Sequence, residues 1–327
     1  MAVIVYAENW SGKFKKSTFE ALSYAHVVAE NLSTSVVALV IGKVATEDLN
    51  LLSQYGASTI CHVDGTNHST DVFSSQLYAR IIADTAIQHQ AKCVIFSHTY
   101  TGKNCAGRVA AILKAGLVTG AIETPTSVNP FMVQKKCFSG KGLAMVTVNT
   151  PVAVISITPN SFKLIAKDVP VKFESSAYSP SGNFPQPHLK EIIQATGKIP
   201  LTEAELVISA GRGMKGAENW GMIEELAIEL NAATACSKPV SDIGWRPHEE
   251  HVGQTGITIG PNLYVAIGIS GAIQHLAGVS SSKTIVVINS DAEAPFFKAA
   301  DYGVVGDAFE VVPRLIQSLR KFKSSHN

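Results

Sequence analysis

The sequence has no apolar run of the roughly 18 residues that a membrane-spanning helix needs. It also has little cysteine: five residues, an odd number, without the paired spacing of a zinc site. No nucleophile and base, and no paired carboxylates, stand in a recognisable arrangement. We therefore expect reduced thiols, no direct membrane insertion and no hydrolytic or metal-dependent active site.

Charge of one sign is lacking as well. The chain carries 27 Lys and Arg against 26 Asp and Glu, a formal net charge of +1, which gives no electrostatic case for nucleic acid. A content of 46% hydrophobic and 16% charged residues indicates buried sheets rather than disorder, and 327 residues favour two domains. Residues 2–8 already have the pattern of a strand, so we expect no targeting peptide and a cytoplasmic protein.

The first half of the chain alternates between buried strands and amphipathic helices. The predicted strands are 3–7, 35–41, 59–63 and 93–96, and the predicted helices are 18–32, 46–55, 71–88 and 102–113. This alternation predicts an α/β domain with a mostly parallel sheet between two helical layers. Further strands at 132–137, 143–149, 152–158 and 169–173 are expected to extend that sheet with antiparallel partners.

Residues 175–187 hold three prolines and no apolar period, which is typical of a linker. We therefore expect domains at 1–187 and 188–327. The second half again alternates, with predicted strands at 206–209, near Cys236, at 263–267, 284–288 and 304–305, and helices at 218–230, 272–277 and 312–322. A second three-layer parallel domain follows, in which ligands bind beyond the carboxyl ends of the strands.

Residues 252–275 have the strongest character of a binding site. A strand at 263–267, too apolar for a surface loop, lies between two glycine-bearing turns. Glycine in the turn Gly268–Gly271 lets a ligand approach the backbone, and the free amides of the following helix favour a phosphate. Gln254, Thr255, Gln274 and His275 are polar groups that can face a flat heterocycle. The stretch therefore predicts a site for a phosphorylated aromatic cofactor.

Gly211–Gly216 matches the G-x-G-x-x-G dinucleotide pattern, after a predicted strand and before a predicted helix. A tight turn without a ligand is the plainer interpretation of the same residues. An NAD site also wants an acid at the end of the next strand, where this chain has Ser237 and Lys238. That lysine could meet the 2′-phosphate of NADP, so an NADP-dependent oxidoreductase is the alternative function.

Five segments, at 209–214, 252–256, 268–278, 288–295 and 300–303, resemble the FAD-binding half of the electron transfer flavoprotein alpha subunit family, in the same order. The first half resembles that family more loosely, through its strand order and Gly107–Ala111. The resemblance implies a nucleotide-hydrolase-like first domain with a vestigial site and beta-subunit contacts, followed by an FAD-binding domain. The FAD contacts that it implies are Arg212, Ser237, Lys238, Val252, Gly253, Gln254, Thr255, Ser270, Gly271, Ala272, Ile273, Gln274, His275, Asn289, Asp307 and Ala308.

The resemblance also implies a function. The chain would be an electron carrier rather than an enzyme, paired with an electron transfer flavoprotein beta subunit. Electrons would come from transient dehydrogenase partners, such as those of fatty acid beta-oxidation, and pass to a quinone oxidoreductase or another acceptor.

Some residues acquire specific roles from the resemblance. The Thr255 hydroxyl would face the reactive flavin nitrogen, and His275, as a donor or an imidazolium, would stabilise negative charge near the pyrimidine carbonyl. Asn289, Asp307 and Ala308 would contact the AMP half of FAD. The family usually has arginine at Lys238, and lysine lacks the planar guanidinium. We therefore expect the one-electron states of the flavin to be less stabilised here.

Two further groups of polar residues are given plainer interpretations. His248 and His251 flank Glu249 and Glu250, but many charges without a helical period predict a solvated loop rather than a metal site. His98, Thr99 and Thr101 follow a predicted strand and could hold a nucleotide. We favour a first domain that supports subunit assembly instead.

Overall fold

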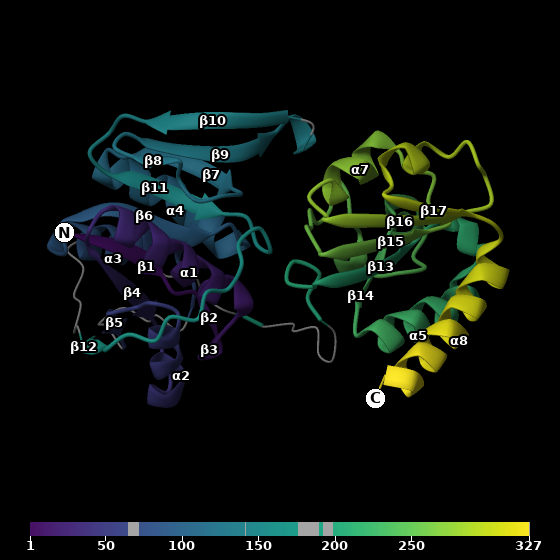
Figure 1. Cartoon of the computed structure of the whole chain (residues 1–327), viewed down its shortest axis with the longest axis horizontal. Coiled ribbons are helices and arrows are strands. Elements are labelled where there is room, and N and C mark those ends of the chain that lie inside the picture. The colour runs from purple at the N-terminus through teal and green to yellow at the C-terminus, as the bar shows by residue number, and fades with distance from the viewer. Residues whose placement is uncertain (65–71, 141, 176–189, 192–198, 327) are drawn as a thin grey trace. The chain divides into compact units, whose positions relative to one another are not determined.

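The computed structural model describes residues 1–64, 72–140, 142–175, 190–191 and 199–326. The chain divides into two compact units, residues 1–137 with 142–194 and residues 138–141 with 195–327 (Figure 1). The expected linker at 175–187 lies almost wholly outside the described residues, and the boundary at 187 stays a prediction.

The first unit contains a ten-stranded sheet of order β10-β9-β7-β11-β6-β1-β4-β5-β12, with β8 paired to β9. Its strands are β1 (Ala2–Tyr6), β4 (Ser35–Ile41), β5 (Thr59–Val63), β6 (Ala91–Ser97), β7 (Gly116–Ala121), β8 (Ser127–Val128), β9 (Phe131–Cys137), β10 (Gly142–Val148), β11 (Ala153–Ile157) and β12 (Lys172–Ser175). A small separate hairpin joins β2 (Asn9–Trp10) and β3 (Lys13–Phe14). The helices are α1 (Lys16–Asn31), α2 (Thr46–Asn50), α3 (Ser75–Gln88) and α4 (Tyr100–Leu113), with a short 3-10 turn at Leu51–Gln54. The 3-10 turn at Phe138–Gly140 belongs to the second unit.

Two apolar layers flank this sheet because its central strands alternate their side chains between two faces. Val3 and Val5 pack with α1 on one face, whereas Ile4 and Tyr6 pack with α3 and α4 on the other. The predicted three-layer α/β arrangement is therefore confirmed for this unit.

The strand predictions for the first unit missed some strands and were partly wrong in direction. β9 and β10 pair antiparallel, as expected. β11 instead runs parallel between β6 and β7, and β12 runs parallel to β5, so the antiparallel prediction is wrong for residues 152–158 and for 169–173. The reason is clearest for β11. Each of its residues is buried, and a strand that is apolar on both faces belongs in the middle of a sheet. β7 was not predicted, because its two glycines weaken the strand pattern.

The second unit contains a parallel five-stranded sheet of order β14-β13-β15-β16-β17. Its strands are β13 (Leu206–Ala210), β14 (Ala233–Cys236), β15 (Leu263–Ile267), β16 (Thr284–Asn289) and β17 (Tyr302–Val305). Its helices are α5 (Gly221–Leu230), α6 (Lys238–Asp242), α7 (Ile273–Val279) and α8 (Ala308–His326), with 3-10 turns at Arg212–Met214, Ala217–Trp220, His248–Glu250 and Pro295–Ala299.

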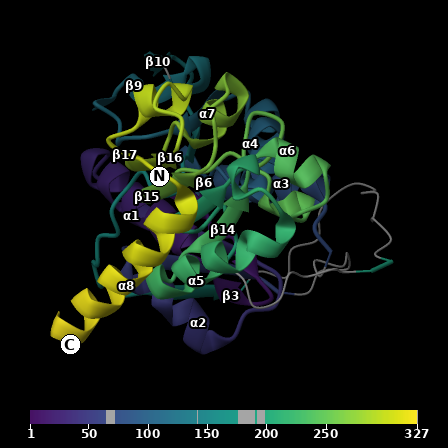
Figure 2. The ribbon, with the colours of Figure 1, turned by 90° about the vertical axis from the view of Figure 1, so that its right-hand side faces the viewer.

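Helices α5 and α8 lie side by side on one face of this sheet (Figures 1 and 2). Arg320 of α8 reaches Glu225 and Glu229 of α5 at 2.8 and 2.7 Å. The opposite face packs against α7 and the 3-10 turn that contains Phe296. The second predicted α/β domain is thus confirmed. None of the helices that the structure describes combines the length and apolarity of a membrane span.

Candidate functional site

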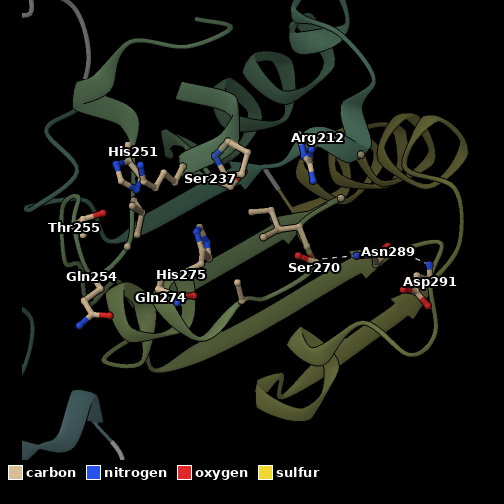
Figure 3. Close-up of a pocket in the computed structure, with 18 residues that line it drawn as sticks. Arg212, Ser237, His251, Gln254, Thr255, Ser270, Gln274, His275, Asn289 and Asp291 are labelled. Carbon is tan, nitrogen blue, oxygen red and sulfur yellow. Dashed lines mark hydrogen bonds between the residues drawn. The ribbon is translucent and has the colours of Figure 1, made fainter. Parts of the chain in front are cut away.

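A cavity of about 590 Å³ lies beyond the carboxyl ends of β13, β14, β15 and β16 (Figure 3). In this strand order the chain leaves β13 toward β14 on one side and β15 on the other, and such a switch point opens a crevice for a ligand. Figure 3 shows His251, Gln254 and Thr255 at one end of the cavity and Asn289 and Asp291 at the other. The volume is within the range of cavities that hold cofactors.

Two glycine turns close against each other at the floor of this site. A Cβ on Gly211 would lie 2.3 Å from the carbonyl oxygen of Gly268, and one on Gly213 would lie 2.6 Å from the Cα of Gly268. Gly268 itself has φ +60, which side chains rarely adopt. The glycines of the G-x-G-x-x-G pattern are therefore explained by contact between the turns after β13 and β15. The expected helix does not begin there, because 3-10 turns follow and α5 starts at Gly221.

Backbone hydrogen bonds and close packing hold the loop that carries Gln254 and Thr255 in place. The Val252 amide donates to the carbonyl of Cys236 at 3.1 Å, and the Gln254 amide donates to the carbonyl of Gln274 at 2.7 Å. A Cβ on Gly278 of α7 would lie 2.5 Å from Gly253, so helix and loop are in close contact. These bonds set Thr255 and His275 at the same end of the cavity.

Most of the predicted site residues line the cavity: Arg212, Ser237, Lys238, Val252, Gly253, Gln254, Thr255, Ser270, Ala272, Gln274, His275 and Asn289. Asn289 also shapes it, since its side-chain amide donates to the carbonyl of Ile269 at 3.0 Å. The sequence prediction therefore brought together side chains from the ends of four strands.

Four predicted residues are not among those that line it. Gly271 has φ +84 and packs against Phe296, where a Cβ would lie 2.5 Å from the Phe296 Cβ. Ile273 is 59% exposed. Asp307 caps the start of α8, where its carboxylate accepts the amide of Phe309 at 2.9 Å. Ala308 is buried in the layer between α8 and the sheet. Their cofactor contacts stay predictions.

His275 is buried beside the cavity. Its Nε2 lies 2.8 Å from the Tyr264 hydroxyl, whereas its Nδ1 has no hydrogen-bond partner among the described residues. Burial, with a smaller contribution from His251, lowers the pKa of His275 to about 4. The ring is therefore neutral near pH 7, which favours the predicted donor role over the imidazolium.

His251 corrects the prediction of a solvated loop. It is 2% exposed and lines the cavity, and the neighbouring Glu250 is 5% exposed. Arg246 is the cause, because its guanidinium bonds both carboxylate oxygens of Glu250 at 2.7 Å and also contacts Glu224 and the Trp220 ring. The His251 ring is packed under Gly256, where a Cβ would lie 2.7 Å from Nδ1. Burial, then His248 and Lys238, lowers its pKa.

Two family models and several known proteins match the chain over most of its length. Residues 3–180 match the electron transfer flavoprotein domain model, and residues 200–280 match the electron transfer flavoprotein FAD-binding domain model. A protein named electron transfer flavoprotein subunit alpha from Syntrophomonas wolfei is 36% identical over 97% of this chain and 98% of its own length. The subunits of that name from Bacillus subtilis and from Arabidopsis thaliana mitochondria are 33% and 32% identical, covering 98% and 99% of this chain and 97% and 91% of their own lengths.

The chain belongs to the electron transfer flavoprotein alpha subunit family. Its cofactor is FAD, and its role is that of an electron transfer flavoprotein. The nicotinamide alternative receives no support from these relatives. Within the described chain, no group of three or more His, Cys, Asp or Glu side chains is arranged to hold a metal ion.

The cavity of this electron transfer flavoprotein subunit fits FAD in its polar chemistry. Both His251 and His275 line it, and the Nδ1 atom of each is buried and has no hydrogen-bond partner in the described part of the chain. A buried polar atom without a partner costs about 1–3 kcal/mol, which a ligand that bonds it recovers. Arg212 and Lys238 add positive charge from the ends of β13 and β14, beside a single lining carboxylate, Asp291.

Six lining residues were absent from the predicted cofactor contacts, although three of them belong to the glycine turns that the sequence singled out: Gly213, Pro239, His251, Gly268, Ile269 and Asp291. Most adjoin residues that were predicted, at the same strand ends. His251 had one usable signal, because it directly precedes the turn at 252–256 and shares its position at the strand end.

Proposed function

We propose that this chain is the FAD-carrying subunit of a heterodimeric electron carrier that transforms no substrate of its own. The family name designates an alpha subunit and so implies a beta-subunit partner. In the proposal, electrons arrive from dehydrogenases, including those of fatty acid beta-oxidation, and leave to a quinone oxidoreductase or similar acceptor in the cytoplasm. Bound FAD supplies the redox chemistry, and the protein supplies position and electrostatics.

One observation carries the proposal: two buried imidazoles, each with an unpaired Nδ1, border the cavity at the strand-order switch point. Both side chains lie at the end of the cavity formed by the loop 251–255 and α7, where a flat ring system with carbonyl groups would find polar partners. At the other end, Asn289 and the turn after β13 leave room for the nucleotide half (Figure 3). The site residues in the proposal are those predicted from the sequence, with His251 added.

Within this proposal each side chain has a simple task. Arg212 and Lys238 attract the negatively charged diphosphate. His275 stays neutral and offers its one N–H as a hydrogen-bond donor, because burial disfavours a second proton on the ring. Its Nε2 stays in contact with the Tyr264 hydroxyl. The loop 251–256 and the turn at 268–271 exclude water from the ring.

The test is the cofactor content of the full chain co-expressed with its beta subunit. We expect a yellow complex with FAD bound to this subunit, and no reduced nicotinamide bound. A double charge reversal, Arg212→Glu with Lys238→Glu, should reduce FAD content at least tenfold. Lys163→Glu, a reversal at an exposed lysine of the first unit, is the matched control and should leave FAD content unchanged.

A colourless complex, or equal FAD content in the double reversal and the wild type, would contradict the proposed site. Electron transfer is tested separately, by mixing the complex with an acyl-CoA dehydrogenase and a quinone-linked acceptor. Turnover of a small substrate by the purified complex alone would contradict the carrier role.

A further inference from the structure

Tyr264 lies behind the cavity, in the middle of the parallel sheet. It belongs to β15, is fully buried, and is one of the largest buried side chains of the chain. Its hydroxyl lies 2.8 Å from Nε2 of His275. The Phe296 ring packs against both, with ring centroids 6.3 Å from Tyr264 and 5.7 Å from His275. The hydroxyl and the imidazole are therefore held together by packing as well as by the hydrogen bond.

The surroundings decide which nitrogen of His275 carries the hydrogen. A neutral imidazole has one N–H and one lone pair, and the bond at one nitrogen fixes the state of the other. The backbone of Val252 raises the pKa of His275, which is the effect of a carbonyl acceptor near a ring N–H, although Nδ1 makes no bond of ordinary geometry. A carbonyl only accepts, so it favours a hydrogen on Nδ1. Nε2 is then the acceptor, and the Tyr264 hydroxyl donates to it.

We propose that Tyr264 is a positioning residue of the FAD site, which fixes His275 as the tautomer with its hydrogen on Nδ1. This inference rests on the proposed function. The tyrosine does not line the cavity; it acts through His275, whose imidazole extends from α7 toward Ser237 and His251 (Figure 3).

The tautomer matters because FAD carries carbonyl oxygens on its ring system, which would accept a hydrogen bond at this wall of the site. With hydrogen on Nδ1, His275 presents a donor to such an oxygen. In the other tautomer Nδ1 presents a lone pair, and two acceptors face each other across a buried contact. The phenol therefore determines whether the nearest imidazole attracts or repels the carbonyl group.

Two measurements on the full chain in complex with its beta subunit test the inference. The first is nitrogen NMR of histidine-labelled protein without FAD, with His275 assigned by its loss in His275→Gln. The wild-type spectrum should show a protonated Nδ1 and an unprotonated Nε2. The second is FAD affinity, which should fall about 3- to 10-fold in Tyr264→Phe, the effect of one net hydrogen bond.

Tyr24→Phe is the matched control. Tyr24 is 1% exposed in the first unit, and its hydroxyl has no hydrogen-bond partner among the described residues. Its loss should change neither the His275 signals nor FAD affinity. In Tyr264→Phe the Nδ1-protonated signal should give way to the other tautomer or to a mixture, which a purely structural role would not produce.

The wild-type spectrum alone can overturn the inference, without any variant that must fold. A hydrogen on Nε2 of His275 would refute it, and so would an unchanged tautomer in Tyr264→Phe. Failure of the proposed function is distinct, because a wild-type complex that binds no FAD refutes that function whatever the tautomer.

Discussion

Both units place histidine at the carboxyl ends of parallel strands, but His98 of the first unit is half-buried, whereas His251 and His275 of the second unit are buried and line the cavity. In the first unit, His98 follows β6 and its Nδ1 lies 2.8 Å from the Ser156 hydroxyl. Thr99 donates to Glu8 at 2.5 Å, and Lys135 donates to Thr119 at 3.0 Å. In the second unit, Nδ1 of His251 and of His275 are buried without partners in the described chain.

The pKa values do not distinguish these sites. Burial lowers the pKa of both His98 and His275 to about 4, with Lys103 and Lys135 adding to the effect at His98. A perturbed histidine therefore marks burial in both units, and the unpaired nitrogen beside a cavity is the feature that indicates a ligand. This agrees with the prediction that the first unit serves assembly, which stays a prediction.

The largest expected effect comes from separating the two glycine turns of the second unit. In Gly268→Ala the added Cβ would lie 2.8 Å from the Cα of Gly213, at a φ of +60. We expect FAD affinity to fall more than tenfold and stability by about 1–3 kcal/mol, measured by calorimetric titration and thermal unfolding. Gly107→Ala in α4 is the control, because nothing lies within 4 Å of its added Cβ. Unchanged affinity in Gly268→Ala would show that these turns do not form the site.

The comparison is sharpened by removing each imidazole in turn. His275→Ala deletes the donor of the cavity, so FAD affinity should fall about 5- to 10-fold. His98→Ala breaks the contact with Ser156 and should lower the unfolding temperature, while FAD affinity stays within about twofold. Titration of both variants with FAD checks this. Equal losses of affinity in the two variants would erase the difference between the units.

Acid should destabilise both units, and bound FAD should reduce this destabilisation only in the second unit, which contains the cavity. A histidine with a pKa near 4 in the fold and 6.5 as its ordinary value binds fewer protons folded than unfolded between those pH values. Its stabilisation is therefore present above about pH 6.5 and lost as the pH falls toward 4. His275→Gln should flatten this dependence for the second unit and His98→Gln for the first, as followed by urea unfolding. The same slope in variant and wild type would contradict the neutral buried state.

The smallest expected effect is at Lys238. Its ammonium pairs with Asp242 at 3.2 Å on the surface, a contact worth little, so the side chain is free to be replaced. Lys238→Arg should raise the yield of one-electron-reduced flavin about 2- to 5-fold in a reductive titration, because the planar guanidinium stacks and bonds in two places. Lys283→Arg, outside the cavity, is the control. No gain in Lys238→Arg would contradict the expectation that lysine at this position stabilises the one-electron states of the flavin less than arginine does.

The sequence predicted most of the strands and most of the cavity, because periodicity and glycine turns are local signals. Leu263–Ile267 became β15, and Gln254, Thr255 and His275 came together. What failed depended on distant contacts. His251 is buried since Arg246 pairs with Glu250 and stacks on Trp220, which no local pattern reveals. The glycines of Gly211–Gly216 match a phosphate motif, yet Gly211 and Gly213 are required by Gly268, more than fifty positions away.

The difference between the units is tested most directly by hydrogen–deuterium exchange of the whole complex with and without FAD. The structure predicts that FAD slows exchange in peptides covering 251–255 and 268–275, at the edge of the cavity. Peptides covering 97–103, where His98 and Thr99 already have partners, should exchange at the same rate in both states. Slowed exchange at 97–103, or none at 251–275, would contradict the assignment of FAD to the second unit.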